Sequence, residues 1–192
     1  MEALLAIGTG IGLSSIAGVR AYLPLVLVGL FARLGFFELS FPFDLLDDWL
    51  VIGVLLALAL LESVLDKVSA FDSILDLVQT PMRILAGAGL FAIALGEGPG
   101  ISAIPELVAG AAIAGTVSIL KSSLRPPTNV ASSGVSVAFL SFFEDVMAII
   151  GGMIAVFVPL APLVLVAFLL FFFYRVSRRR GRKYGGLRIL GN

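Results

Sequence analysis

Long apolar runs, separated by short polar stretches, fill most of the 192-residue chain. Several of them approach or exceed the length of about 20 residues that crosses a bilayer as a helix. The runs lie at about residues 3–19, 49–65, 82–95, 101–120, 135–158 and 163–174. This pattern predicts an all-α, polytopic membrane protein with about six spans, because helices satisfy their own backbone hydrogen bonds within lipid.

Polar residues break the pattern at two places of similar composition. The first apolar run continues past Arg20 and Pro24, and a second break at residues 121–134 contains Arg125 followed by two prolines. Proline suits the first turn of a new helix, so we expect broken or re-entrant helices after spans one and four. Residues 23–34 would reach only about 18 Å as a helix. They are therefore predicted to form a re-entrant or tilted half-helix rather than a crossing of their own.

The two breaks suggest an internal repeat. An offset of 105 positions places Arg20 on Arg125 and Gly10 on Gly115. Two halves of three spans each have opposite orientations, so we expect a 3+3 inverted-topology repeat within one transmembrane domain, residues 1–174. The halves would be residues 1–97 and 98–174. Broken helices at matching positions of inverted halves are typical of transporter binding sites.

Composition agrees with a membrane protein, and charge orients it. Hydrophobic residues make up 59% of the chain and charged residues 14%, against about 25% charged in soluble domains, and mean hydropathy is +1.11. Net charge is zero, but seven of the thirteen basic residues follow Tyr174. The positive-inside rule predicts that tail 175–192 is cytoplasmic. It also predicts a cytoplasmic N-terminus and an external acidic loop containing Asp44, Asp47 and Asp48.

The expected location is the plasma membrane, which for a bacterium is the inner membrane. The basic tail is interpreted as a topology anchor near anionic lipid headgroups, not as a nucleic-acid-binding segment. The chain contains no cysteine and no histidine, which excludes disulfides, thiolate chemistry and the commonest metal ligand. No nucleotide-binding, serine-hydrolase or zinc-protease motif is present. We therefore expect no enzyme activity, no cofactor and no bound metal.

Arginine at a helix break is the strongest candidate for binding chemistry. A helix that begins after a break directs free N–H groups toward the site, and guanidinium adds a planar fork that suits phosphate or carboxylate. Arg20 and Arg125 are predicted to hold an anion. Neutral hydrogen bonds would come from nearby polar side chains, namely Ser14, Ser15, Tyr22, Thr128, Asn129, Ser132 and Ser133. Arg33 and Arg83 are interpreted instead as interfacial arginines that snorkel to the membrane surface.

Four acids lie at or near predicted spans and are functional candidates by that position alone. Glu62 and Asp66 share one helical face because they are four residues apart. Glu144 and Asp145 interrupt the fifth apolar run. Three roles are open: ion pairs with the arginines, carriage of coupling protons, or a cluster of oxygen ligands for a cation.

Two stretches give the chain a family resemblance. "AGVRAYLPL", residues 17–25, and "ESVLDKVSAFDSILDLVQTPMRILAGA", residues 62–88, resemble the bacterial and plant membrane-protein family known as domain of unknown function 4126. The resemblance implies a small multi-span protein without an assigned activity. In that family the region of Thr80 to Arg83 is expected to read closer to Thr-x-x-Arg-Pro. This chain has Ile84 where that proline would be, so the resemblance gives less support to a functional role for Arg83.

The sequence favours a secondary transporter or translocase for an anionic substrate that carries phosphate or carboxylate, working by alternating access. Glu62, Asp66, Glu144 and Asp145 would balance the arginines or carry protons. One alternative is an acid-lined cation channel or transporter, and another is a non-transporting membrane assembly factor. The expected partners are membrane lipids and an anionic small molecule or lipid phosphate, and a homo-oligomer stays open.

Overall fold

A computed structural model describes residues 2–65, 72–96, 103–124, 137–168 and 171. Its elements are α1 (Glu2–Val19), α2 (Tyr22–Arg33), the 3-10 helix η1 (Phe43–Asp47), α3 (Trp49–Leu65), α4 (Asp72–Leu95), α5 (Ile104–Leu124) and α6 (Val137–Phe157). Leu160–Phe168 forms a further short helix. The described part of the chain contains no strand, so the predicted all-α class is confirmed for it.

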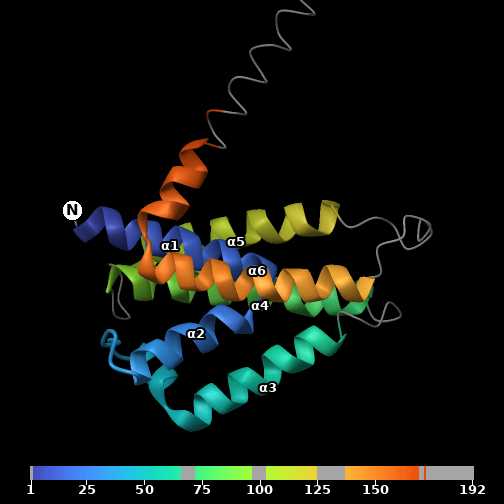
Figure 1. Cartoon of the computed structure of the whole chain (residues 1–192), viewed down its shortest axis with the longest axis horizontal. Coiled ribbons are helices and arrows are strands. Elements are labelled where there is room, and N and C mark those ends of the chain that lie inside the picture. Colours follow the sequence, from blue (N-terminus) through green and yellow to red (C-terminus); the bar gives the residue numbers. More distant parts are fainter. Residues whose placement is uncertain (1, 66–71, 97–102, 125–136, 169–170, 172–192) are drawn as a thin grey trace, which may run out of the picture.

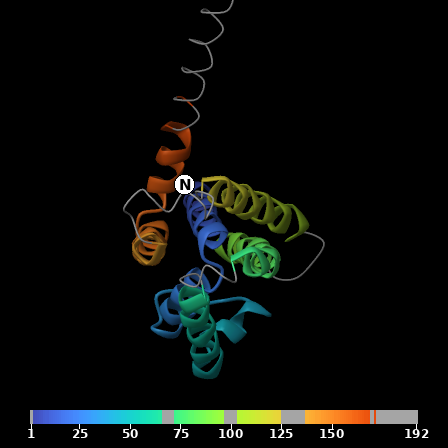
Figure 2. The same cartoon turned by 90° about the vertical axis from the view of Figure 1, so that its right-hand side faces the viewer.

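α1 lies in the centre of the bundle (Figures 1 and 2). It packs against α4, α5 and α6, while α2, η1 and α3 form a second group along one side. Small residues let the central helices approach closely, as is common between membrane helices. A Cβ added at Gly87 of α4 would overlap the Cβ of Ala114 on α5 and would lie 3.5 Å from the backbone oxygen of Ser14 on α1.

These contacts fix the helix directions. Gly10 of α1 lies against Phe91 of α4, and Ser14 contacts Gly87, so α1 and α4 are antiparallel. Gly110 of α5 lies against Phe91, whereas Ala114 lies against Gly87, so α4 and α5 are antiparallel as well. α1 and α5 therefore run in the same direction, as Figure 1 shows.

Parallel α1 and α5 contradict the inverted repeat at the offset of 105 positions. That repeat pairs α1 with α5 and requires the two helices to run in opposite directions. The prediction is wrong because it did not treat α2 as a helix that runs back to the end of the bundle where α1 begins. α2 leads back from the end of α1 toward the loop before η1 (Figure 1), so every later helix is reversed relative to the expectation.

The predicted helices are present, but six full spans are not shown. Two described helices, Glu2–Val19 and Ile104–Ser123, are long and apolar enough to cross a membrane. Ser141–Phe157 and Leu160–Phe168 make a third span if the bent pair counts as one. α2, α3 and the part of α4 from Gln79 to Leu95 are shorter apolar helices. Length and composition thus support two or three spans.

Three local features differ from or refine the sequence expectation. The break after α1 is confirmed, and Pro24 lies in the first turn of α2 as predicted. α4 begins at Asp72 and contains Pro81, so it extends ten residues before the predicted apolar run at residues 82–95. The axis turns by 112° between α6 and the short helix Leu160–Phe168, so this helix leads away from the bundle (Figure 1) instead of returning antiparallel to it.

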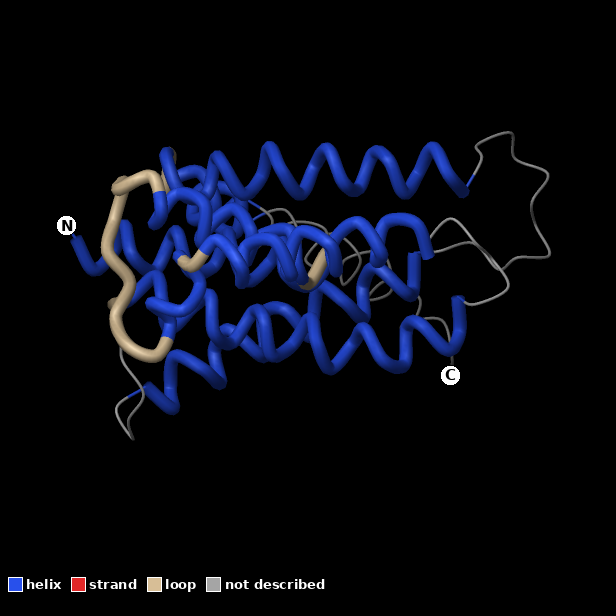
Figure 3. Tube along the Cα trace, turned by 90° about the horizontal axis from the view of Figure 1, so that it is seen from below, coloured by secondary structure: helices blue, strands red, loops and turns tan. Residues whose placement is uncertain are grey.

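The helix ends are grouped at the two ends of the bundle. The N-terminus lies at the same end as the loop before η1 (Figures 1 and 3), although the sequence placed them on opposite sides of the membrane. The C-terminal ends of α1, α3 and α5 lie toward the other end, together with the start of α6 (Figure 1). The charged side chains described next come from that second end.

Candidate functional site: a buried charge network at a helix break

Arg20 occupies the break between α1 and α2, and its side chain is fully buried. Its Nη2 donates to the Ser141 hydroxyl at 2.8 Å and to the Ser141 carbonyl at 3.2 Å. Its Nε lies 2.8 Å from Oδ1 of Asp145, and Nη2 lies 3.9 Å from Oε2 of Glu144. All three partners come from the first turns of α6. The arginine therefore joins the helix break to the start of the last long helix.

Glu62 and Arg83 form a second buried pair beside the break. Only 3% of Glu62 and 2% of Arg83 is exposed. Arg83 Nη2 lies 3.6 Å from Glu62 Oε1 and also donates to the Gln79 side chain. The Ala21 N–H donates to the same Glu62 oxygen at 3.4 Å. The first free N–H before α2 thus faces a carboxylate, as the dipole of a helix N-terminus favours.

Lys121 connects the network to the end of α1. Its Nζ lies 2.7 Å from Oε2 of Glu144 and donates to the Val19 carbonyl at 2.9 Å. The last carbonyls of a helix lack partners within the helix, and an ammonium group there satisfies one of them and complements the dipole. Lys121 therefore stabilises the broken end of α1 and a carboxylate of α6 at the same time.

The described network contains three cations and three acids, so its formal charges sum to zero. Its cations are Arg20, Arg83 and Lys121, and its acids are Glu62, Glu144 and Asp145. Ser63 of α3 also donates to Asp145 at 3.0 Å. Ions taken out of water carry a large desolvation penalty that pairing only partly offsets. A network of this size is therefore unlike ordinary core packing, and ionisable residues within apolar helices are candidates for function.

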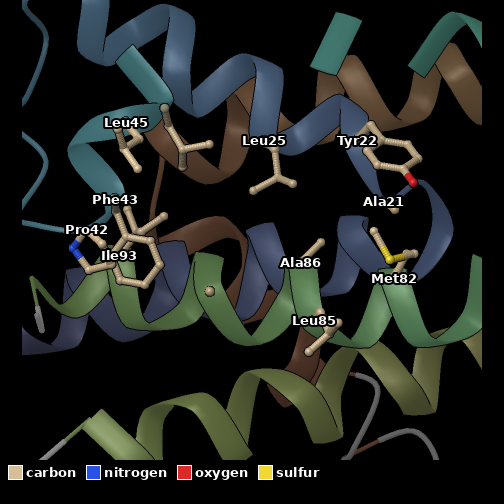
Figure 4. Close-up of a pocket in the computed structure, with 12 residues that line it drawn as sticks. Ala21, Tyr22, Leu25, Pro42, Phe43, Leu45, Met82, Leu85, Ala86 and Ile93 are labelled. Carbon is tan, nitrogen blue, oxygen red and sulfur yellow. The ribbon is translucent and has the colours of Figure 1, made fainter. Parts of the chain in front are cut away.

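An apolar groove runs from this network toward the acidic loop. It lies between α2 and α4, is closed at its far end by η1, and has a volume of about 380 Å³. Leu25 of α2 faces Ala86 of α4 across it, and Phe43 and Ile93 lie at the far end (Figure 4). Tyr22 lies at the end nearest the helix break (Figure 4).

Residues 7–179 match the family described as domain of unknown function, DUF4126. The match covers most of the chain and includes every residue of the charge network. The chain belongs to the DUF4126 family. No curated protein and no solved structure matches this DUF4126 chain, so its site must be interpreted from its own geometry.

The structure brings together part of the predicted site of this DUF4126 protein. Arg20, Glu144 and Asp145 meet directly, and Glu62 lies beside them with Arg83. The expected ion pairs between acids and arginines are therefore present in the described region. Because no group of three or more acids among the described residues could hold a metal ion, this region gives no support to a cation-binding cluster.

Other predicted residues lie elsewhere or outside the described region. The hydroxyl of Ser14 donates to the Gly87 carbonyl, and that of Ser15 donates to the Ile11 carbonyl. Both serines therefore serve helix contacts instead of an open site. Tyr22 lines the groove. The remaining predicted residues, Arg125, Thr128, Asn129, Ser132, Ser133 and Asp66, lie outside the described residues, so a paired-arginine site stays a prediction.

Sequence reasoning underrated two cations. Arg83 was interpreted as interfacial, yet it is buried against Glu62 and Gln79. The available signal was the spacing of Gln79 and Arg83, which puts two polar side chains on one helical face. Lys121 was assigned no role beyond its place in the polar break at residues 121–134. Arg33 does conform to the interfacial interpretation, because it is exposed and its guanidinium lies 5.6 Å from the centre of the Trp49 ring.

Proposed function

We propose that this DUF4126 protein is an integral membrane transporter or translocase for an anionic substrate bearing phosphate or carboxylate. The observation that carries the proposal is the environment of Arg20. A fully buried guanidinium at a helix break is held by two carboxylates and a serine of a different helix. Arg20 already contacts carboxylate oxygens of Asp145 and Glu144. An external anion would replace the oxygen of Asp145.

Binding and charge balance are linked in this mechanism. An anion at Arg20 would take the place of Asp145 and weaken the contact with Glu144. Glu144 keeps Lys121 as a partner at 2.7 Å, while the displaced Asp145 would take up a proton or follow its helix outward. Since these contacts join the α1–α2 break to α6, their exchange would change how α6 sits against the break. This is the elementary step that alternating access needs.

The two ends of the bundle support one orientation in the membrane. Leu65 and Leu124 end helices at the network end, and the basic residues Lys67 and Arg125 follow them in the sequence. The opposite end carries the acidic loop. By the positive-inside rule the network end would face the cytoplasm of a plasma or bacterial inner membrane. The N-terminus would then be external, which revises the sequence expectation. Since α6 would end on the external side, a cytoplasmic basic tail 175–192 would require the predicted run at residues 163–174 to cross the membrane again.

A specific observation favours a second candidate, a non-transporting membrane assembly factor. The six described charges neutralise each other, which is what a purely structural network requires. The two functions respond differently to a charge swap. Arg20→Asp combined with Asp145→Arg would restore a structural role, whereas an anion-binding site would lose its arginine from the helix break and stay inactive.

Binding of octyl phosphate to the full chain in lipid nanodiscs, measured by calorimetry, tests the proposal. We expect the wild type to bind octyl phosphate and not octyltrimethylammonium. The paired variant Arg20→Met/Asp145→Leu removes the arginine without leaving Asp145 unpaired, and it should bind at least about tenfold more weakly. Arg33→Met, which removes an exposed arginine, is the matched control and should bind like the wild type. Equal affinity in the paired variant would overturn the proposal.

A further inference from the structure

Asp145 depends on Arg20 for its charge balance. Its Oδ1 lies 2.8 Å from Arg20 Nε and accepts a hydrogen bond of 3.0 Å from the Ser63 hydroxyl. Within the described part of the chain, Arg20 is the one cation in contact with Asp145. An anion that binds Arg20 in place of Asp145 therefore leaves this carboxylate with a single neutral partner, the hydroxyl of Ser63.

The other two acids of the network keep a cation when the anion binds. Glu144 lies 2.7 Å from Lys121 on α5, and Glu62 lies 3.6 Å from Arg83 on α4. Neither of these contacts involves the guanidinium that the anion would occupy. Asp145 is thus the acid whose charge the anion leaves uncompensated.

Charge balance sets the number of protons that the site needs. The three cations and three acids of the described network are neutral together. A carboxylate left without a cation in a place of low dielectric is neutralised by protonation. One proton at Asp145 exactly offsets an anion with one negative charge, whereas an anion with two charges would leave the site negative. A phosphate monoester meets this condition in its singly charged form, because its second pKa is about 6.

Asp145 is accessible to a proton from water. Its side chain is 18% exposed, against 2% for that of Glu62. The Ser63 hydroxyl both donates and accepts, so it serves the carboxylate of the empty site and the carboxylic acid of the loaded site. At this end of the bundle, the other charged or titratable groups with described side chains are Arg20, Tyr22, Glu62, Arg83, Lys121 and Glu144. Arg83 and Lys121 are each matched by an acid of their own.

We infer that Asp145 is the proton-binding residue of a transporter that carries one proton with each singly charged anion. The anion at Arg20 displaces the Asp145 carboxylate, which then binds a proton from water. When the anion leaves on the other side of the membrane, the proton leaves as well and Asp145 pairs with Arg20 again. Both states of the site are neutral, so neither requires an uncompensated charge within the membrane. This inference rests on the proposed function and names its coupling ion.

Proton uptake on anion binding tests the inference. The probe is octyl methyl phosphate, a phosphate diester that keeps one negative charge near neutral pH. Calorimetric titrations of the full chain in lipid nanodiscs, in buffers with different heats of ionisation, give the number of protons bound per anion. We expect about one proton for the wild type. The affinity should then fall about tenfold for each unit of rising pH, because the loaded site holds one proton more than the empty site.

Variants assign the proton to one residue. Asp145→Asn retains a polar side chain of similar size that cannot bind the proton. It should bind octyl methyl phosphate without proton uptake and with an affinity that does not change with pH. The matched controls are two paired variants, each of which removes a different acid together with its own cation: Lys121→Met/Glu144→Gln and Arg83→Met/Glu62→Gln. Both should retain an uptake of about one proton per bound anion.

The outcomes separate the inference from the proposed function. Binding that is lost in Arg20→Met/Asp145→Leu but takes up no proton in the wild type would overturn the inference and leave the proposed function standing. Uptake that persists in Asp145→Asn, or disappears in a paired variant that still binds, would assign the proton to another acid and overturn the inference as well. If Asp145→Asn does not fold, the wild-type proton count and the paired variants decide. Equal binding of this probe and of octyl phosphate by the wild type and Arg20→Met/Asp145→Leu would overturn the proposed function.

Discussion

Removing Arg20 alone should destabilise the protein far more than removing it together with Asp145. Arg20→Met leaves Asp145 and part of the Glu144 interaction without a cation in a buried place. Breaking a buried ion pair by removing one partner costs about 3–5 kcal/mol. Asp145→Leu alone leaves Arg20 with the more distant Glu144, at 3.9 Å, and should cost a similar amount.

The double variant should recover most of that loss. With both groups apolar, Arg83 still faces Glu62, and Lys121 still holds Glu144 at 2.7 Å. The remaining formal charges are again balanced. Replacing a buried ion pair by apolar residues of similar volume is often neutral or stabilising, so we expect the double variant within about 1 kcal/mol of the wild type. The coupling energy between the two sites should then be at least about 5 kcal/mol.

Equilibrium unfolding of the four proteins in detergent micelles, followed by circular dichroism, measures this cycle. Arg33→Met is the control, because it removes an arginine that does not belong to the buried network. Arg33 is exposed above Trp49, and an exposed cation–π contact contributes about 0.5–1 kcal/mol. Additive losses in the double variant, or a loss from Arg20→Met no larger than that of Arg33→Met, would refute the buried network.

Three further substitutions test parts of the fold in the same unfolding assay. Lys121→Met removes the closest cation from Glu144 and should cost about 3 kcal/mol, and a loss below about 1 kcal/mol would contradict the contact. Gly87→Val forces side-chain atoms against Ala114 and should cost more than the 1–3 kcal/mol or so that is typical of overpacking, whereas an unchanged free energy of unfolding would contradict the close α4–α5 approach. Gly53→Ala meets open space and should stabilise α3 by up to about 1 kcal/mol, so destabilisation there would show that the α3 surface is covered.

The sequence predicted the helices because each depends mainly on its own residues. Continuous apolar runs specify helices in lipid, and the predicted range 49–65 coincides with α3. The break after α1 was also local, since an arginine followed by a proline in the first turn of the next helix marks it. The start of α4 was not predicted, because residues 72–81 lie before the apolar run at residues 82–95 and include Pro81, which the structure retains inside the helix.

The relations between helices could not be predicted in the same way. Whether Arg83 snorkels or is buried depends on which helices surround it, and Glu62 approaches it from α3. Lys121 likewise gains its role only from the position of the α1 end and of Glu144. The predicted direction of α5 relative to α1 depended on whether α2 runs back along α1. An error at this one segment reverses the predicted direction of every later helix.

The central claim of the proposed function is that Arg20 holds an anionic substrate during its movement across the membrane. Its most direct test uses proteoliposomes that contain a dodecyl phosphate with a fluorophore at the chain end, in both leaflets. Dithionite added outside quenches the outer leaflet, and slower quenching reports movement from the inner leaflet. The wild type should give this second phase, and the folded Arg20→Met/Asp145→Leu variant should match protein-free liposomes. A second phase of equal rate in that variant, or none in the wild type, would contradict the account.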